Sequence, residues 1–473
     1  MSNSSLSTRG VKYLESPPYL KVFSKYLSEE AIFNPETNPK GCISLAAAET
    51  VTFADLLTER LNQIRQSVPV TQDTFGYGRF TGHRRLCRAL AAYFTEFIVG
   101  GNPNPALDPS AFVVCNGAGT AIESLVASLC DPGDYVIIPT PMYHNLVVDV
   151  EKRFSARVLH LPMKQVPLSG GDKDASSASF TFTYEIDFQR LAAEYERVER
   201  AGQGRVRAFV HCNPHNPTGM VFGREVTKRL IAWCVERSIH FVSDEIYAMS
   251  RLRVPAAAAN PFVSALRICR EAEAEPSSTR PPWVARCRDY VHLVYSFSKD
   301  IGLNGYRAGV TYTENSALLK ALEEVSYFTS IASAVQISLA AFLEDLDFMR
   351  KMLDTSAERT TALYQRCTAF LNSRGIRTFS STTAGMFIWL DLITLLDKVN
   401  SRNPEYTKKS MREKEDWIWQ RMLDGGVCIL PSYIFQPEAS GWFRVCFTTT
   451  KEKYVMEGLR RILAAVEGPQ SRL

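Results

Sequence analysis

Short apolar runs alternate with helical patterns through the middle of the chain. The runs are rich in Val, Ile and Phe, end in polar residues, and are followed by segments whose apolar positions recur with a helical period. This alternation is typical of a mostly parallel β-sheet with helices on both faces, which places the chain in the α/β class. We predict strands at 111–116, 134–140, 206–214, 240–247 and 291–298, with helices at 119–130 and 224–238.

The pattern changes after about residue 333. Longer helical segments follow, and apolar runs at 385–392 and 441–448 predict strands of a second, smaller α+β domain. Two polar segments without apolar periodicity, 169–179 and 270–282, are predicted to be surface loops. We therefore divide the chain into residues 1–70 (an N-terminal arm and part of the small domain), 71–332 (the large domain) and 333–473 (the C-terminal small domain).

Composition narrows the classes of function. Of the 473 residues 45% are hydrophobic and 22% charged, and the net charge of +4 gives no support for nucleic-acid binding. No run of 18 apolar residues predicts a membrane span, and the N-terminus lacks the apolar region of a secretory signal. The eleven widely spaced cysteines are expected to be reduced. The tripeptide Ser471-Arg472-Leu473 is a close variant of the peroxisomal address S-K-L, so we expect a peroxisomal or a cytoplasmic protein.

Polar residues follow several of the predicted strands. In open α/β sheets the ligand lies outside the carboxyl ends of the strands, so these residues are candidates for a site. Ala118 and Gly119 begin a predicted helix, whose free N–H groups can hold a phosphate, although glycine is common at such turns. The turn NPHNPTG at 213–219 is rich in proline. Asp244 either caps a helix or faces a cationic ring nitrogen, with the phenol of Tyr247 nearby.

Lys299 ends a predicted strand within the stretch YSFSKDIGLNGYRAG. Such a lysine either extends its amine to solvent or uses it as a nucleophile that forms a Schiff base. Pyridoxal phosphate (PLP) requires a Schiff-base lysine, an acid at its pyridinium nitrogen, and cations and hydroxyls for its phosphate. Asp244 is the candidate acid, and Ser296, Ser298 and Arg307 can contact the phosphate. The order of these motifs favours a PLP site.

From about residue 41 to residue 464 the chain resembles the class I aminotransferase superfamily of PLP enzymes, and within it most of all the 1-aminocyclopropane-1-carboxylate (ACC) synthases. YSFSKDIGLNGYRAG, GWFRVCF at 441–447 and SLAAAET at 44–50 carry the likeness. It implies a PLP-dependent transferase fold of the aspartate aminotransferase type, whose large domain has a mostly parallel seven-stranded sheet. It also implies a homodimer with active sites at the interface, an amino-acid substrate and no metal.

The resemblance assigns a role to each candidate residue. Lys299 holds PLP covalently and then moves the Cα proton, while Asp244 pairs with the pyridinium nitrogen. Arg444 grips the substrate α-carboxylate as a bidentate fork, and Glu49 meets a distal, cationic part of the substrate. Tyr143 stacks on the cofactor ring. The other implied cofactor contacts are Ala118, Gly119, Asn216 (also near the substrate), Tyr247, Ser296, Ser298 and Arg307.

The sequence departs from the family pattern at a few positions. The family commonly has a tyrosine that reaches the cofactor phosphate across a dimer interface. The best match here is Phe80, which has no hydroxyl and is expected at the substrate, although Tyr77 lies three residues earlier. Met142 stands where an aromatic residue is usual, and Thr218 gives the general aminotransferase form NPTG.

Three functions are compatible with these motifs. The first is an ACC synthase-like lyase of secondary metabolism, which acts at Cα and expels a sulfur leaving group from Cβ or Cγ by elimination or replacement. The second is a class I/II aminotransferase, in which the proton removed from Cα is added to the cofactor. The third is a catalytically inactive protein of the same fold, but Lys299 and Arg444 are both present and speak against it.

Overall fold

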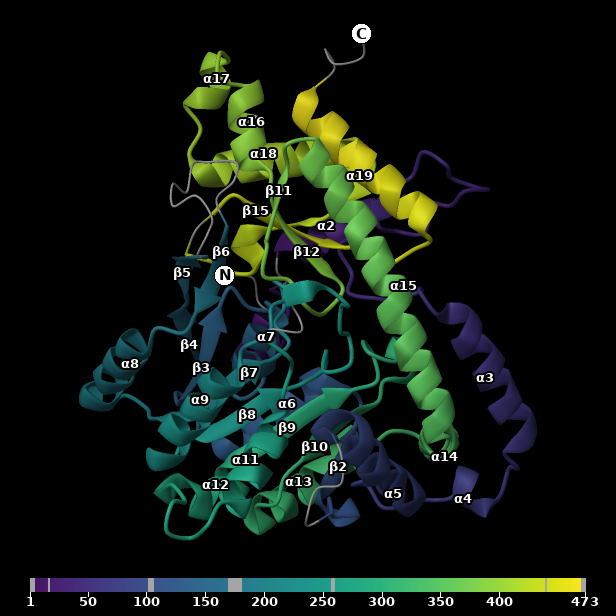
Figure 1. Ribbon diagram of the computed structural model, residues 1–473, viewed down its shortest axis with the longest axis vertical. Coiled ribbons are helices and arrows are strands. Elements are labelled where there is room, and N and C mark those ends of the chain that lie inside the picture. Colours follow the sequence, from purple (N-terminus) through teal and green to yellow (C-terminus); the bar gives the residue numbers. More distant parts are fainter. Residues whose placement is uncertain are drawn as a thin grey trace.

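The computed structural model describes residues 5–15, 18–100, 106–168, 181–256, 260–438 and 440–468. The predicted loop at 169–179 and the C-terminal tripeptide at 471–473 lie outside these ranges. Figure 1 shows a large α/β unit in the lower half of the view and a smaller unit above it. The single-sheet large domain and the α+β small domain expected from the sequence are therefore both present.

The large unit is built on a seven-stranded sheet with the order β2-β10-β9-β8-β7-β3-β4. All neighbouring strands are parallel except β10, which is antiparallel to both β2 and β9. The predicted fold class is confirmed, because the sheet is mostly parallel and has helices packed on it. The strands are β2 (Phe112–Cys115), β3 (Tyr135–Thr140), β4 (Arg157–Pro162), β7 (Val206–Cys212), β8 (His240–Asp244), β9 (Val291–Ser296) and β10 (Gly309–Tyr312).

Helices cover both faces of this sheet, because successive side chains of a buried strand point to opposite faces. On one face Val210, Val242 and Val294 pack against α6 (Ala118–Leu129), α7 (Asn145–Glu151) and α13 (Ser316–Thr329). The opposite face packs against α5 (Arg84–Tyr93), α8 (Phe188–Ala201), α9 (Arg224–Glu236), α11 (Ala265–Ala274) and α14 (Ser333–Leu343). Short helices α4 (Gln72–Phe75) and α12 (Cys287–Tyr290) also belong to this unit.

The smaller unit has an antiparallel sheet with the order β11-β12-β15-β14. Its strands are β11 (Arg377–Thr378), β12 (Phe387–Asp391), β14 (Leu430–Pro431) and β15 (Trp442–Cys446), and β13 (Val427–Cys428) pairs in parallel with the N-terminal β1 (Ile43–Ser44). The remaining pair is β5 (Lys164–Pro167) with β6 (Phe182–Glu185). The helices are α16 (Ile393–Val399), α17 (Pro404–Thr407), α18 (Met411–Asp424) and α19 (Glu452–Glu467).

One long helix joins the two units. The N-terminal half of α15 (Leu346–Ser373) packs in the large-sheet core through Met349 and Met352, and its C-terminal half packs in the small-domain core through Leu363 and Cys367. Helix α14 and the N-terminal helix α3 (Ala54–Ser67) also pack in the large-sheet core. The predicted domain boundaries stay a prediction.

One sequence prediction was wrong in part. Residues 270–282 were expected to be a surface loop, but α11 continues to Ala274. The apolar residues that bury this helix, including Ile268 and Cys269, lie mostly before residue 270, so the predicted loop began midway through an amphipathic helix.

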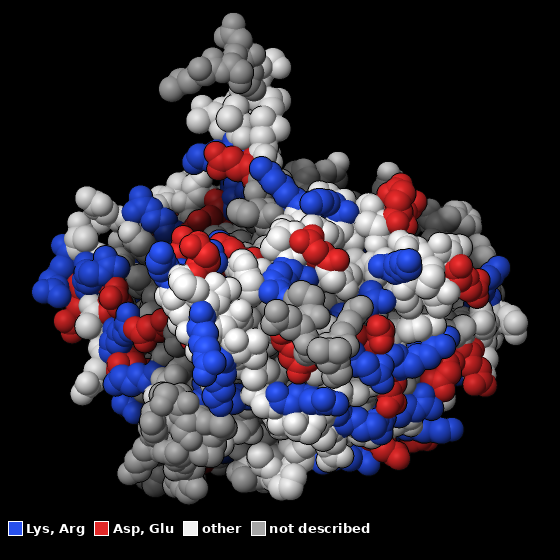
Figure 2. Space-filling view, turned by 90° about the horizontal axis from the view of Figure 1, so that it is seen from above, with Lys and Arg blue, Asp and Glu red and all other residues white. Residues whose placement is uncertain are grey.

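The surface and the cysteines agree with the composition. On the face shown in Figure 2, Lys and Arg side chains lie among Asp and Glu side chains. All eleven cysteines are free. Within the described ranges no single helix is long and apolar enough to cross a membrane; α13 and α14 meet that criterion only as a pair, with a bend of 117° between them.

Candidate active site

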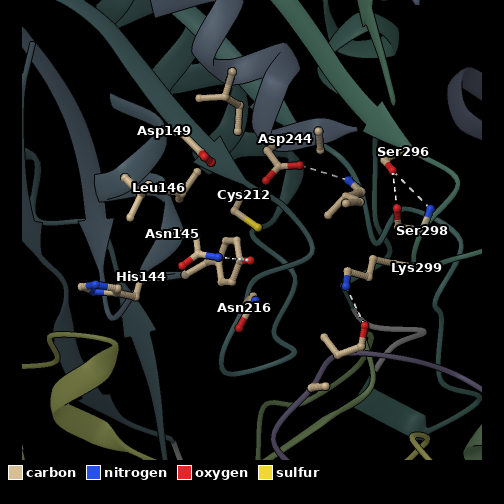
Figure 3. Close-up of a pocket in the computed structure, with 18 of the residues that line it drawn as sticks. His144, Asn145, Leu146, Asp149, Cys212, Asn216, Asp244, Ser296, Ser298 and Lys299 are labelled. Carbon is tan, nitrogen blue, oxygen red and sulfur yellow. Dashed lines mark hydrogen bonds between the residues drawn. The ribbon is translucent and has the colours of Figure 1, made fainter. Parts of the chain in front are cut away.

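A cavity of about 860 Å³ lies at the carboxyl ends of the central strands, where the two units meet. Figure 3 shows side chains from α7, β7, β8 and β9 directed into it. The sequence candidates that line it are Glu49, Ala118, Gly119, Tyr143, Asn216, Asp244, Tyr247, Ser296, Ser298, Lys299, Arg307 and Arg444. The fold thus brings together residues that lie as far apart in the sequence as Glu49 and Arg444.

Lys299 is held just beyond the end of β9. Phe297 and Ile301 on either side of it are fully buried in the large-sheet core, which fixes the turn. The amine donates a hydrogen bond of 2.6 Å from Nζ to the carbonyl oxygen of Ala48. Burial lowers the pKa of this amine to about 8, because a charged ammonium is poorly solvated in the cavity. A lysine in this state is a competent nucleophile near neutral pH.

Asp244 ends β8 and is buried at the inner end of the cavity. Burial raises the pKa of its carboxyl to about 6, although a hydrogen bond from the Ile246 N–H to Oδ1 (3.3 Å), the Cys212 thiol and the Lys299 ammonium oppose the shift. A carboxylate in this position gains stability from a cation placed against it. The arrangement suits a protonated ring nitrogen.

The start of α6 forms a cradle with Arg307. A Cβ added at Gly117, whose φ is 123°, would lie 2.7 Å from Nη2 of Arg307, so only glycine allows the guanidinium to approach this turn. The first N–H groups of a helix have no partner within it, and together with a guanidinium they form a site for an anion. The Ser296 and Ser298 hydroxyls, 2.9 Å apart, lie at the same end of the cavity.

Arg444 lies in the buried middle of β15. Its Nη1 donates to Oδ1 of Asn216 at 2.9 Å and its Nη2 to the carbonyl oxygen of Ala46 at 2.5 Å. The guanidinium lies 4.9 Å from the ring centroids of both Phe387 and Phe435. Its buried Nε has no hydrogen-bond partner in the described part of the chain. A planar, desolvated cation with an unused donor is suited to a carboxylate ligand.

The remaining polar candidates are tied to their neighbours. Asn216 Nδ2 donates a long hydrogen bond of 3.5 Å to the Tyr247 hydroxyl. The exposed Glu49 accepts a hydrogen bond of 2.9 Å at Oε1 from Asn304 Nδ2. Tyr143 accepts one of 2.8 Å at its hydroxyl from Asn145 Nδ2.

Phe80 does not line the cavity of its own chain. It lies on the surface, with its ring 5.4 Å from that of Tyr327, and Tyr77 close by is fully exposed. The single chain therefore does not bring either residue to the cavity.

Sequence reasoning missed Asp149, Asn145 and Asn304, which also line the cavity. Asp149 projects from α7 toward the start of α6, and a Cβ added at Gly119 would lie 3.2 Å from its Oδ1. Burial, followed by the charges of Glu123 and Asp244, raises the pKa of Asp149 to about 7. The sequence did contain a signal for Asp149, because a charged residue between two valines, next to the buried Val150, is unusual.

A family model for class I and II aminotransferases matches residues 42–462. The chain belongs to the class I and II aminotransferase family. Members of this family are PLP enzymes, so this protein is a PLP-dependent enzyme. The expected fold type, cofactor and enzymatic nature are thereby confirmed.

Curated relatives of this chain include ACC synthases. The rice (Oryza sativa subsp. japonica) ACC synthase 3 is 30% identical over 453 residues, which cover 95% of this chain and 92% of the relative. ACC synthase 1 of Cucurbita pepo is 28% identical over 461 residues, which cover 96% and 84%. The predicted likeness to ACC synthases is confirmed at this level.

Solved structures agree on the fold. Aspartate aminotransferase from Thermus thermophilus with maleate superimposes with a TM-score of 0.70 at 20% identity, covering 98% of this chain and 100% of that one. Kynurenine aminotransferase from Pyrococcus horikoshii gives a TM-score of 0.70 at 15% identity, covering 98% and 97%.

The cavity of this family member fits PLP. Its glycine cradle would hold the phosphate, Asp244 would pair with the cationic ring nitrogen, and Lys299 would supply the amine for the carbonyl carbon. When bound, PLP serves as an electron sink for the bonds at the substrate Cα. The protein then has to orient the substrate, move the Cα proton and stabilise the charges that develop.

Proposed function

We propose that this enzyme is an ACC synthase-like lyase, which removes the Cα proton of an amino acid and expels a sulfur leaving group from Cβ or Cγ. The observation that best supports this proposal is the position of Glu49 in the cavity. Residues 46–49 form one wall: Arg444 binds the carbonyl oxygen of Ala46, Lys299 that of Ala48, and Glu49 follows directly. This wall runs from the proposed carboxylate site past the reactive amine to a carboxylate.

The charges along this wall match a particular kind of substrate. An amino acid bound through its α-carboxylate at Arg444 has its Cα beside Lys299 and extends its side chain toward Glu49. A carboxylate there stabilises a positive charge on that side chain, such as a sulfonium. A sulfonium is also a good leaving group, because it departs as a neutral thioether. The ACC synthase names of the relatives support the same choice.

The departures from the synthase pattern do not alter this wall. Thr218, which gives the general aminotransferase form NPTG, is buried and pairs its hydroxyl with Nδ1 of His215 at 2.8 Å. Neither Thr218 nor Met142 lines the main cavity. These substitutions therefore do not favour an aminotransferase over a lyase.

We further propose that the enzyme is a homodimer. Large apolar side chains are exposed together on α4, the loop after it and the end of α13, which is unfavourable for a monomer in water. They are Phe75 (76% exposed), Tyr77 (100%), Phe80 (39%), Tyr327 (66%) and Phe328 (79%). A second copy covering this surface brings Phe80 or Tyr77 toward a neighbouring cavity, in line with the role implied by the family resemblance.

Binding of a matched pair of ligands tests the proposed role of Glu49. S-adenosylmethionine carries a sulfonium, and S-adenosylhomocysteine carries a neutral thioether with the same adenosyl group. We expect Glu49→Gln to weaken binding of the sulfonium about three- to ten-fold and to leave the thioether unchanged. Glu29→Gln, at an exposed glutamate outside the cavity, is the control. Equal losses for both ligands would remove the support that Glu49 gives to a sulfonium substrate.

A further inference from the structure

The N-terminal segment forms one wall of the cavity. Tyr13 follows α1 (Thr8–Lys12), and Tyr19 and Phe23 project from α2 (Pro18–Tyr26); all three line the cavity. Tyr19 is the most buried of them, at 9% exposure, and its ring packs edge-on against Phe23 and His144. A segment that lies far from the catalytic lysine in sequence thus reaches the same cavity.

Tyr19 is linked to Tyr143 through one amide side chain. The Tyr19 hydroxyl donates a hydrogen bond of 2.7 Å to Oδ1 of Asn145, and Nδ2 of Asn145 donates one of 2.8 Å to the Tyr143 hydroxyl. Figure 3 shows the second of these bonds as a dashed line from Asn145, and Tyr143 lines the cavity. In this orientation the amide bridges the two phenols, because its oxygen accepts from Tyr19 and its nitrogen donates to Tyr143.

Helix α7 holds the N-terminal segment at two points. Asn145 is the first residue of α7 and binds Tyr19, while Lys152, just after its last residue, donates from Nζ to the carbonyl oxygen of Glu15 at 3.1 Å. Lys152 Nζ also lies 6.0 Å from the ring centroid of Tyr13. The segment is therefore fixed on the same helix that carries Asn145 and Asp149.

We propose that Tyr19 is a positioning residue for Tyr143. By fixing the Asn145 amide it fixes the Tyr143 hydroxyl, and thereby the ring that the family resemblance implies would stack on PLP. Docking of α2 over the cavity and the orientation of this ring are then a single event. The inference does not depend on which bond the enzyme breaks, so it stands or falls independently of the lyase proposal.

The affinity of the full-length enzyme for PLP tests this link without measuring turnover. Tyr19→Phe removes only the hydroxyl, and we expect it to raise the Kd for PLP, measured by equilibrium dialysis, about three- to ten-fold, the effect of one neutral hydrogen bond. Tyr143→Phe should raise it at least as much. Because the link ends at the Tyr143 hydroxyl, the double variant should equal Tyr143→Phe. Tyr26→Phe is the matched control, since Tyr26 is on the same helix and its hydroxyl binds Asp424 outside the cavity.

Two results would overturn the proposal. One is a Kd for Tyr19→Phe equal to that of the unaltered enzyme. The other is a double variant weaker than Tyr143→Phe by the full factor of Tyr19→Phe, because independent effects multiply. Should Tyr19→Phe lose its native circular dichroism, Asn145→Ala breaks the same link from its middle and is judged by the same two criteria.

Discussion

Arg444 Nη1 donates a hydrogen bond of 2.9 Å to Oδ1 of Asn216, a residue 228 positions earlier in the chain. Asn216 in turn lies 3.5 Å from the Tyr247 hydroxyl through its Nδ2. The proposed carboxylate site in the small unit is thereby connected to Tyr247, an implied cofactor contact in the large unit. One asparagine orients the residues on both sides.

This connection separates the expected effects of two variants. Arg444→Ala removes the cation that binds the α-carboxylate, so KM should rise by one to two orders of magnitude while PLP stays bound. Asn216→Ala should raise KM less but also shift the absorption maximum of the bound cofactor, since it touches both sites. Steady-state kinetics and absorption spectra measure these effects. A KM of Arg444→Ala equal to that of the unaltered enzyme would contradict this assignment.

The lowered pKa of Lys299 predicts the pH dependence of cofactor capture. Only the neutral amine attacks a carbonyl, so the rate of PLP uptake by apoprotein should rise about tenfold per pH unit below pH 8 and level off above it. Stopped-flow absorbance follows this uptake, and Lys299→Ala, which lacks the amine, should give no covalent phase. A rate that keeps rising until about pH 10 would mean an ordinary, solvated lysine.

The raised pKa of Asp149 predicts a change in stability with pH. Between about pH 4, the ordinary aspartate pKa, and about pH 7, Asp149 is protonated in the folded state but ionised in the unfolded state. The folded state therefore binds more protons, and the free energy of unfolding falls as pH rises through this range. Without PLP, Asp149→Asn should therefore gain stability relative to the unaltered protein, on the order of 2–4 kcal/mol more at pH 7.5 than at pH 4.5.

Thermal unfolding at the two pH values measures this gain. Asp347→Asn, at an exposed aspartate, is the matched control and should show no such trend. If the advantage of Asp149→Asn is the same at both pH values, Asp149 is ionised in the folded protein throughout.

The exposed aromatic surface predicts the assembly state. Tyr77 and Phe328 are 100% and 79% exposed, so replacing both by aspartate should cost the isolated fold little but oppose burial against a second copy. We expect sedimentation velocity to show a dimer for the unaltered enzyme and a shift toward monomer for the double variant. An unaltered enzyme that stays monomeric at micromolar concentration would refute the dimer.

Much of this fold follows from local patterns. The strands that end at Asp244 and shortly before Lys299 are short, apolar and followed by polar residues, so both their type and the edge that holds the site could be predicted. The end of α11 was missed because only small alanines, Ala272 and Ala274, continue its apolar positions after Cys269.

The parts of the site that were missed depend on tertiary contacts. Asn145 reads as an ordinary helix-start residue, and only the folded chain places Tyr19, 126 positions away, against it. Asp149 offered a local signal, but its neighbour Gly119 comes from another helix. Such pairs are invisible to periodicity, because no spacing relates them.

The reaction type is tested most directly by turnover without an amino acceptor. S-adenosylmethionine and cysteine conjugates are incubated with the enzyme in the absence and presence of a 2-oxo acid, and the sulfur product and consumed amino acid are quantified. The lyase proposal predicts many turnovers without the 2-oxo acid and one sulfur product released per amino acid consumed. Conversion that stops after one equivalent and resumes only when a 2-oxo acid is added would contradict it, and would identify an aminotransferase.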